Sequence, residues 1–274
     1  MTYSLIALDI DGTIRSPEYP ISGRTLEAIT RARSTGAVVT VATGRIFQSA
    51  RKACADLDLK DPIVAFQGAM VGDPYTGSVM WHQPLSTDMT MEALSVLGRA
   101  RHEILSYVGD DIYVTAMTPR AEAYADRNEI DIHVVTDLRE TAILQPTRLV
   151  VFGLPQEILG LEDELKQHFG TNLYITKSLE TFCEILNPSS GKEKALSWLC
   201  SQIGVSESNT LVFGNGYNDV PMLNWAGCGV AISGSVQDAL DVCDKMAPPI
   251  EEDGVAQVIE EFLDEGLIGF SRNF

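Results

Sequence analysis

Two carboxylates separated by one residue stand near the start of the chain, in the segment 9–13, DIDGT. They follow an apolar run at residues 5–8, which is typical of a buried strand. Residues i and i+2 of an extended chain project to the same side, so we expect Asp9 and Asp11 to face one crevice at the carboxyl end of this strand. Two carboxylates so close repel each other, and a proton or a divalent cation relieves that repulsion. The alternative is a solvated Asp-Gly turn.

Three further segments carry residue types that bind phosphate or metal. A Thr hydroxyl and a Gly amide, Thr43 and Gly44 in VATGR, can hold a phosphate oxygen. Lys192, at the start of a predicted helix, can reach a phosphate and offset carboxylate charge. The oxygen-rich turn at residues 215–219, NGYND, suits Mg²⁺. Taken singly, each segment has an ordinary alternative: a loop, a surface lysine or an Asx-rich turn.

Neither glycine-containing turn matches a nucleotide-binding motif. Leu186 occupies the first glycine position of a Walker pattern, and Glu193 follows Lys192 where Ser or Thr is required. Asp219 stands where the dinucleotide fingerprint requires a sixth-position glycine. We therefore expect neither a Walker nor a dinucleotide-binding loop.

Apolar runs and helical patterns alternate in the first and last parts of the chain. In the first part, runs at 5–8, 37–41 and 63–66 enclose helical patterns around 26–32 and 46–57. In the last part, helical patterns at 192–203 and 220–225 alternate with runs at 211–213 and 228–232. This alternation predicts a parallel sheet with right-handed crossovers. The four segments above follow its strands or lie beside them.

The middle of the chain has a different character. Strand patterns at 147–152, 172–176 and 182–185 are interleaved with helical patterns at 88–101, 119–128 and 156–169. We therefore expect an α+β domain at residues 84–186, inserted into a discontinuous core made of residues 1–83 and 187–274.

Composition narrows the classes of partner. The 274 residues include 20 basic and 38 acidic side chains, a formal net charge of -18, which argues against nucleic acid or a membrane surface as partner. An anionic substrate would need local cations or a metal. The five cysteines are scattered, and the start of the chain lacks the pattern of a signal peptide. We expect a cytoplasmic protein, and the sequence gives no indication of its oligomeric state.

The order of these segments resembles the haloacid dehalogenase-like superfamily of aspartate-nucleophile phosphatases, and in particular its Cof-type sugar phosphatase branch. The likeness covers nearly the whole chain and extends to Gln67-Gly68-Ala69 and Glu184-Ile185. The middle segment matches the α/β cap of that branch in position and size. The resemblance implies an α/β fold, with a Rossmann-like doubly wound parallel sheet core and an inserted α+β cap domain.

The resemblance also implies a function. The implied function is that of a magnesium-dependent phosphatase that hydrolyses a small phosphorylated metabolite through an aspartyl-phosphate, with a sugar phosphate as the expected substrate. The implied catalytic residues are Asp9 as nucleophile, Asp11 as acid and base, and Thr43 and Lys192 as stabilisers of the phosphoryl oxygens. The implied substrate-binding residues are Thr43, Gly44, Lys192 and Asn218, and the implied Mg²⁺ ligands are Asp9, Asp11 (through its backbone carbonyl), Asn215 and Asp219.

Two departures from the family pattern leave alternatives open. Asn215 stands where the family usually has a metal-binding Asp, so either Asp219 takes a larger share of the metal or catalysis is weak. Weak catalysis would indicate a sugar-phosphate-binding or regulatory protein. A phosphotransferase is a third interpretation of the same motifs. Gln67 replaces an Asn that relatives tend to have. Arg45 could pair with acids of the cap or reach the substrate.

Overall fold

A five-stranded parallel sheet carries the strand ends predicted to bear the site. The computed structural model describes residues 2–98, 102–128 and 130–270. The strand order is β14-β13-β12-β1-β2, and every neighbouring pair is parallel. The strands are β1 (Leu5–Leu8), β2 (Val38–Val41), β12 (Thr210–Gly214), β13 (Cys228–Ile232) and β14 (Lys245–Ala247). The apolar runs predicted as strands of this sheet near residues 5, 38, 211 and 228 are confirmed, while β14 was not predicted.

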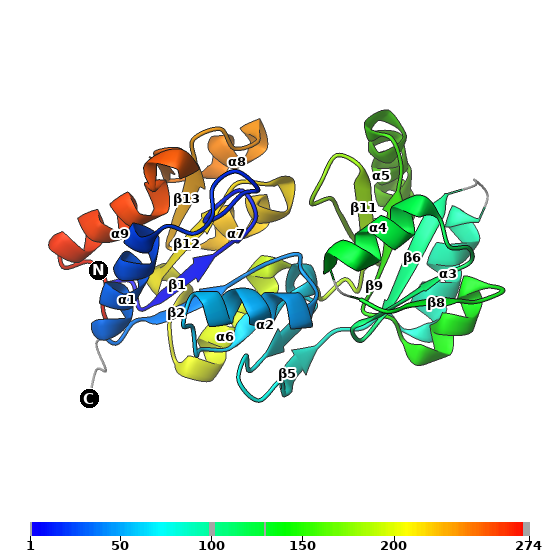
Figure 1. The fold of residues 1–274 in the computed structure, drawn as a ribbon, viewed down its shortest axis with the longest axis horizontal. Helices are drawn as coiled ribbons and strands as arrows, with labels where there is room; N and C mark the ends of the chain where they lie inside the picture. The colour runs from blue at the N-terminus through cyan, green and yellow to red at the C-terminus, as the bar shows by residue number, and fades with distance from the viewer. Residues whose placement is uncertain (1, 99–101, 129, 271–274) are drawn as a thin grey trace.

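Helices cover both faces of this sheet (Figure 1). One face carries α1 (Gly23–Ser34), α2 (Phe47–Asp56) and α9 (Gly254–Asp264), and the other carries α6 (Lys192–Ile203), α7 (Val220–Trp225) and α8 (Gln237–Val242). Successive residues of a strand point to opposite faces. Ile6 and Leu8 of β1 accordingly belong to the same apolar cluster as α1, α2 and α9, whereas Leu5 and Ala7 belong to the cluster of the other three helices. The core is doubly wound, as predicted.

The third predicted strand belongs to a different sheet. β3 (Ile63–Ala65) pairs antiparallel with β4 (Met70–Gly72), which pairs antiparallel with β5 (Val79–His82). An isolated parallel bridge between Ala42 and Val64 links β3 to the chain just beyond β2. The prediction that residues 63–66 extend the parallel sheet as a full strand is therefore wrong. At Phe66, whose φ is +50°, the chain leaves the extended conformation and turns back, so β3 forms its ladder with β4.

The middle of the chain forms a six-stranded sheet with the order β10-β11-β9-β6-β7-β8. Its strands are β6 (Glu103–Val108), β7 (Asp111–Val114), β8 (Ile132–Val134), β9 (Arg148–Phe152), β10 (Tyr174–Thr176) and β11 (Phe182–Leu186). The accompanying helices are α3 (Thr87–Leu97), α4 (Pro119–Asn128) and α5 (Pro155–Phe169). Helices α3 and α5 pack with Leu149 and Val151 on one face, and α4 lies on the side nearer the core (Figure 1). We call this unit the cap.

The predicted cap elements near residues 88, 119, 148, 156, 174 and 182 are confirmed, while β6, β7 and β8 were not predicted. The predicted helix at 88–101 ends at Leu97, and its last three residues lie outside the described part of the chain. The domain boundaries at residues 84 and 186 stay a prediction. Short 3₁₀ turns complete the chain: η1 (Phe66–Gly68), η2 (Leu138–Leu144), η3 (Glu207–Asn209), η4 (Tyr217–Asp219) and η5 (Ile250–Glu252).

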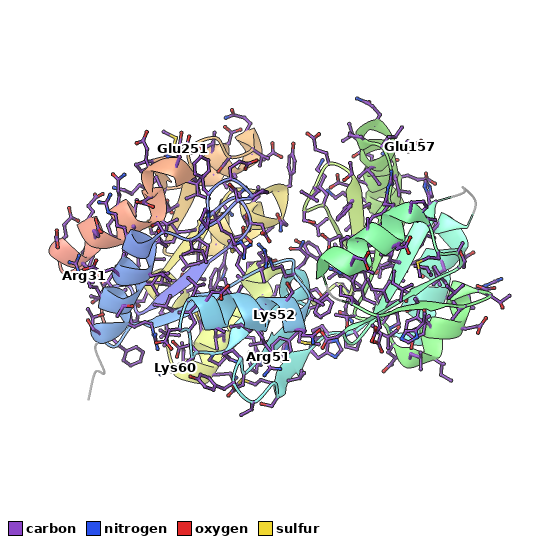
Figure 2. The ribbon with its side chains drawn as sticks, in the orientation of Figure 1. Arg31, Arg51, Lys52, Lys60, Glu157 and Glu251 are labelled. Atoms are coloured by element: carbon purple, nitrogen blue, oxygen red, sulfur yellow. The ribbon has the colours of Figure 1, made fainter. Side chains whose placement is uncertain are left out.

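Charged side chains lie largely on the outer surface. Figure 2 shows Arg31, Lys60 and Glu251 on the outside of the core and Glu157 on the outside of the cap. A charged side chain that is buried instead needs a specific partner. Across residues 2–98, 102–128 and 130–270, no helix has both the length and the apolar character needed to cross a membrane.

Candidate active site

Parallel register brings the predicted segments to one edge of the core sheet. Strands β12, β1 and β2 are neighbours, and Leu8 lies opposite Phe213 on one side and Val41 on the other. The pairing continues past the strand ends: Asp9 N donates to Phe213 O (3.0 Å), and Ala42 N donates to Leu8 O (2.9 Å). The segments that follow these strands therefore start side by side at the carboxyl edge, where doubly wound sheets bind ligands.

A buried ammonium lies between two buried carboxylates at this edge. Lys192 Nζ donates to Asp9 Oδ1 (2.7 Å) and to Asp219 Oδ1 (2.6 Å). Burial, and next the charge of Asp219, raise the pKa of Asp9 to about 7, although Lys192 acts in the opposite direction. Burial alone would lower the pKa of Lys192, but the two carboxylates raise it above its ordinary value, so the ammonium stays charged. The structure thus brings together three residues that the sequence predicts for the site.

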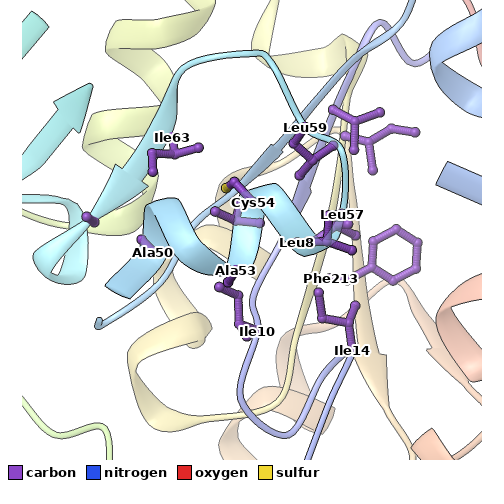
Figure 3. Close-up of a cluster of buried hydrophobic side chains, with 14 of the residues drawn as sticks. Leu8, Ile10, Ile14, Ala50, Ala53, Cys54, Leu57, Leu59, Ile63 and Phe213 are labelled. Carbon is purple, nitrogen blue, oxygen red and sulfur yellow. The ribbon is translucent and has the colours of Figure 1, made fainter. Parts of the chain in front are cut away.

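Apolar side chains anchor the loop that carries Asp9 on the core. Ile10 and Ile14 are buried in the cluster that includes helix α2, as Figure 3 shows. Gly12 has a φ of +87°, which favours glycine, and a Cβ there would lie 2.3 Å from Asn215 Nδ2. The absence of a side chain at this position therefore lets the amide of Asn215 lie directly over the loop.

Asp11 lies apart from the buried cluster. Its side chain is 58% exposed and accepts two hydrogen bonds from Arg45, from Nε (2.7 Å) and from Nη2 (2.5 Å). This bidentate arrangement is the favourable geometry for a guanidinium and a carboxylate. Arg45 thus pairs with an acid of the core. The sequence leads us to expect a pair with an acid of the cap or a contact with the substrate, and the observed contact is neither of those. In this structure the Asp11 carboxylate is therefore engaged by Arg45.

The segment after β2 is held by the turn at residues 66–68. Gln67 N donates to Thr43 O (3.1 Å), and Phe66 N donates to Arg45 O (2.8 Å). A Cβ on Gly44 would lie 2.4 Å from Gln67 Nε2, so glycine lets the Gln67 amide lie against this segment. The buried Thr43 hydroxyl accepts from Arg45 N (3.2 Å), and within the described residues no acceptor is recorded for its hydrogen. That hydrogen remains for a ligand oxygen.

Asp219 uses both of its carboxylate oxygens within the protein. Oδ1 accepts from Lys192, and Oδ2 accepts from the backbone N–H groups of Asn215 and Gly216, each at 2.9 Å. Oδ2 thus accepts two hydrogen bonds, whereas Oδ1 accepts one and keeps a lone pair that a cation could take. The observed contacts make Asp219 an orienting group for Lys192 and for the turn, and its predicted role as a metal ligand stays a prediction.

The oxygens best placed for a cation surround Thr13. Its Oγ1 lies 3.2 Å from Asp9 Oδ2 and 3.0 Å from Asn215 Oδ1. A hydroxyl carries one hydrogen, so it can donate to only one of these two oxygens at a time. These side-chain oxygens are of the kind that Mg²⁺ takes together with water, and the predicted role of the Asp11 carbonyl beside them stays a prediction.

Side-chain acids alone do not make this site. In the part of the chain that the structure describes, no three His, Cys, Asp or Glu side chains gather as a metal cluster. A cation held here would draw on an amide oxygen, a backbone carbonyl and water besides Asp9. Oxygen donors of these kinds fit Mg²⁺.

The sequence motifs assign no role to a second buried ion pair, which joins the cap to this edge. Arg148 Nη1 donates to Glu184 Oε2 (2.6 Å) and to Gly44 O (2.8 Å). Glu184 Oε1 accepts from Gln67 Nε2 (2.8 Å), and Asn218 Nδ2 donates to Gln67 Oε1 (2.9 Å). The sequence signal that could have revealed this ion pair is one charged residue in each of two otherwise apolar strands, RLVVF and FCEIL.

Comparison with known proteins agrees with this geometry. A family model described as haloacid dehalogenase-like hydrolase matches residues 6–259. The chain is 28% identical over 262 residues to 5-amino-6-(5-phospho-D-ribitylamino)uracil phosphatase YitU of Bacillus subtilis (strain 168), covering 94% of this chain and 97% of that protein. It is also 28% identical over 284 residues to pyridoxal phosphate phosphatase YbhA of Escherichia coli (strain K12), covering 98% of this chain and 100% of that protein.

Solved structures show the same fold. A haloacid dehalogenase-like hydrolase from B. subtilis superposes with a TM-score of 0.83 at 22% identity, covering 94% of this chain and 99% of that chain. At this identity the likeness shows the fold alone. The family model spans most of the chain and includes all four predicted segments. The chain is therefore an enzyme of the haloacid dehalogenase-like hydrolase family, as the sequence motifs indicate.

Proposed function

We propose that this enzyme is a magnesium-dependent phosphomonoester hydrolase that forms an aspartyl-phosphate on Asp9. The observation that carries the proposal is the buried Lys192 ammonium, bonded to both Asp9 and Asp219 at the carboxyl edge of the sheet. The two named relatives above are phosphatases of small phosphorylated metabolites. We extend that substrate class to this chain, with sugar phosphates among the first candidates.

Local positive charge accounts for anion binding by a protein of net charge -18. The Lys192 ammonium attracts the phosphoryl group, and the Thr43 hydroxyl and the Gly44 amide donate to its oxygens. The Asn218 amide has a second N–H besides the one donated to Gln67, and we assign that N–H to another phosphoryl oxygen. A bound Mg²⁺, held by Asp9, Asn215 and the Asp11 carbonyl, would neutralise charge and supply Lewis acidity at the phosphoryl oxygens.

In the first half-reaction, an Asp9 carboxylate oxygen attacks phosphorus and the ester P–O bond breaks. The leaving alkoxide takes a proton from Asp11, which must have left Arg45 and become protonated. Lys192 holds the Asp9 carboxylate in place for attack through the bond to Oδ1. The products of this step are the free alcohol and the aspartyl-phosphate.

In the second half-reaction, the Asp11 carboxylate takes a proton from water as that water attacks phosphorus. The bond between the Asp9 oxygen and phosphorus breaks, which restores Asp9 and releases inorganic phosphate. Return of Asp11 to Arg45 would then reset the site. The exposed position of Asp11 allows its side chain to exchange between Arg45 and the crevice.

A screen of phosphorylated metabolites for phosphate release tests this proposal. We expect magnesium-stimulated release from one or more sugar or cofactor monophosphates and from a generic aryl phosphate. Chelation with EDTA should remove the activity, and added Mg²⁺ should restore it. Release that is absent from every substrate, or equal with EDTA and with Mg²⁺, would contradict the proposal.

Asn215 favours one alternative, a phosphate-binding protein with weakened catalysis. The Asn215→Asp variant separates the two functions because it adds a negative charge beside Asp9 Oδ2 without changing side-chain size. For a working enzyme we expect several-fold tighter apparent Mg²⁺ binding, with kcat at saturating Mg²⁺ changed by less than about tenfold. A much larger gain in kcat, measured by magnesium titration of phosphate release, would support the weakened alternative instead.

A further inference from the structure

Gln67 lies where the cap and three segments of the core meet. Its backbone N–H bonds to Thr43, its amide lies against Gly44, and its side chain bonds to Glu184 of the cap and to Asn218. The side chain is buried, with 1% of its surface exposed. Such a position is suited to transmit the placement of one element to another.

The backbone at this point is strained. Phe66, Gln67 and Gly68 have φ values of +50°, +56° and +82°, so two non-glycine residues in succession occupy the left-handed region. A Cβ on Gly68 would lie 2.1 Å from Gly191 O, so the turn also packs directly on the backbone that leads into Lys192. A conformation of this cost persists because the surrounding contacts hold it in place.

The Glu184 carboxylate sets the direction of every hydrogen bond in the chain of contacts. Carboxylate oxygens only accept, so Gln67 must present its NH₂ group to Glu184. The carbonyl oxygen of Gln67 therefore faces Asn218, which must in turn present its own NH₂ group. The orientation of the Asn218 amide, and the aim of its second N–H, follow from the charge on Glu184.

Arg148 ties this polarity to the seating of the cap. Its guanidinium bonds to Glu184 within the cap and to Gly44 O in the core, and it stacks on Tyr107 of the cap (4.4 Å) and Phe66 of the core (5.2 Å). Through both its hydrogen bonds and its ring contacts, Arg148 therefore joins the cap to the core. Removal of the cap from this position would withdraw Glu184 from Gln67.

We propose that Gln67 is a positioning residue, which orients the Asn218 amide toward the phosphoryl group only while the Arg148–Glu184 pair of the cap is seated against the core. The inference rests on the proposed function, in which Asn218 binds a phosphoryl oxygen. In this arrangement the buried ion pair contributes to anion binding without contacting the substrate. Occupation of the site and seating of the cap thereby favour each other.

A double-mutant cycle on inorganic phosphate binding tests the relay. Gln67→Met keeps the approximate volume and removes both side-chain hydrogen bonds, and we expect the Kd for phosphate in the presence of Mg²⁺ to rise about tenfold. Asn218→Ala should raise it by a similar factor. In the Asn218→Ala background, Gln67→Met should add less than about twofold, because its route to the ligand is already gone. Calorimetric titration measures all four proteins.

Ser178→Ala is the matched control. Ser178 Oγ donates to the same Glu184 Oε1 (2.6 Å) but makes no recorded contact with Gln67 or Asn218 in the described residues. We expect it to leave the phosphate Kd within about twofold while lowering the melting temperature as a lost, partly buried hydrogen bond should. A tenfold rise in this control, or a Gln67→Met effect that persists undiminished beside Asn218→Ala, would overturn the relay.

A second variant keeps the test decisive if Gln67→Met does not fold. Glu184→Gln preserves size but lets the amide at position 67 turn over, so we expect a several-fold rise in phosphate Kd that again vanishes beside Asn218→Ala. An unchanged Kd would overturn the proposal. Phosphate binding can be measured without turnover, so the relay and the proposed hydrolysis are tested independently. If the effects of the two substitutions on the phosphate Kd are additive in a protein that hydrolyses substrate, only the relay is rejected. If those effects are non-additive in a protein that hydrolyses no substrate, only the proposed hydrolysis is rejected.

Discussion

The Asp9→Asn variant should lose phosphate release by about 10⁴-fold or more at saturating Mg²⁺, because the amide cannot form the phosphoryl-enzyme. The substitution keeps the shape of a side chain that is buried and bonded to Lys192, so the loss should be in kcat rather than in folding. Initial rates with an aryl phosphate measure it. Rates equal to those of the wild type would remove the assignment of Asp9 as nucleophile.

The same variant should be more stable than the wild type when metal is absent. The pKa of Asp9 is raised from 3.8 to about 7, first by burial and then by Asp219, so the folded state disfavours its charged form. Below 3.8 the group is protonated in both states and carries no penalty. As the pH rises toward about 7, the unfolded chain loses the proton more readily and the folded state loses stability, fully so above that value.

We therefore expect the free energy of unfolding in EDTA to be higher for Asp9→Asn than for the wild type at pH 8, and the difference to shrink on acidification to pH 5. Urea unfolding at both pH values measures it. A catalytic group that costs stability is the usual compromise at an active site. A wild type more stable than the variant at pH 8 in EDTA would contradict the raised pKa.

Lys192→Met should have the second largest effect, and it should act on both activity and stability. Loss of one group that stabilises transition-state charge typically lowers kcat by about 10²–10³-fold, and we expect a loss of this order in kcat/KM. The variant also leaves two buried carboxylates without their shared counter-charge, and breaking a buried ion pair costs about 3–5 kcal/mol. Kinetics with an aryl phosphate and urea unfolding at pH 8 measure the two losses.

Lys194→Met provides the matched control on the same helix. Its ammonium is exposed and donates to Pro188 O (2.7 Å), away from Asp9 and Asp219. We expect kcat/KM within about twofold of the wild type and a stability change within about 0.5 kcal/mol. Equal effects of Lys192→Met and Lys194→Met would contradict a specific role for Lys192.

Much of the core follows from local pattern. Apolar runs such as residues 5–8 and 228–232 predict strands that the structure confirms, because burial on both faces requires a continuous apolar sequence. The candidate residues at strand ends converge for an equally simple reason: the carboxyl ends of parallel strands share an edge. Proximity of Asp9 to Asp219 follows from this geometry, whereas the place of Lys192, which opens a helix after a strand of the cap sheet, was implied by the family resemblance.

Other features depend on contacts between residues far apart in the chain. The turn at Phe66 ends β3 early because its backbone bonds to the segment after β2, a condition absent from the run of residues 63–66 itself. Arg45 could reach several acids, and only packing selects Asp11. Long side chains have many rotamers of similar energy, so their partners are decided by neighbours that the fold supplies.

The sequence alone was enough to place Asp9 and the turn that bears Asp219 at one edge, because the carboxyl ends of neighbouring parallel strands lie side by side, and the family resemblance added the lysine. The joining of cap to core through Arg148, Glu184 and Gln67 emerged only once the chain was folded. Buried polar groups must find donors and acceptors wherever they end up, and those partners come from distant segments whose meeting no local pattern encodes.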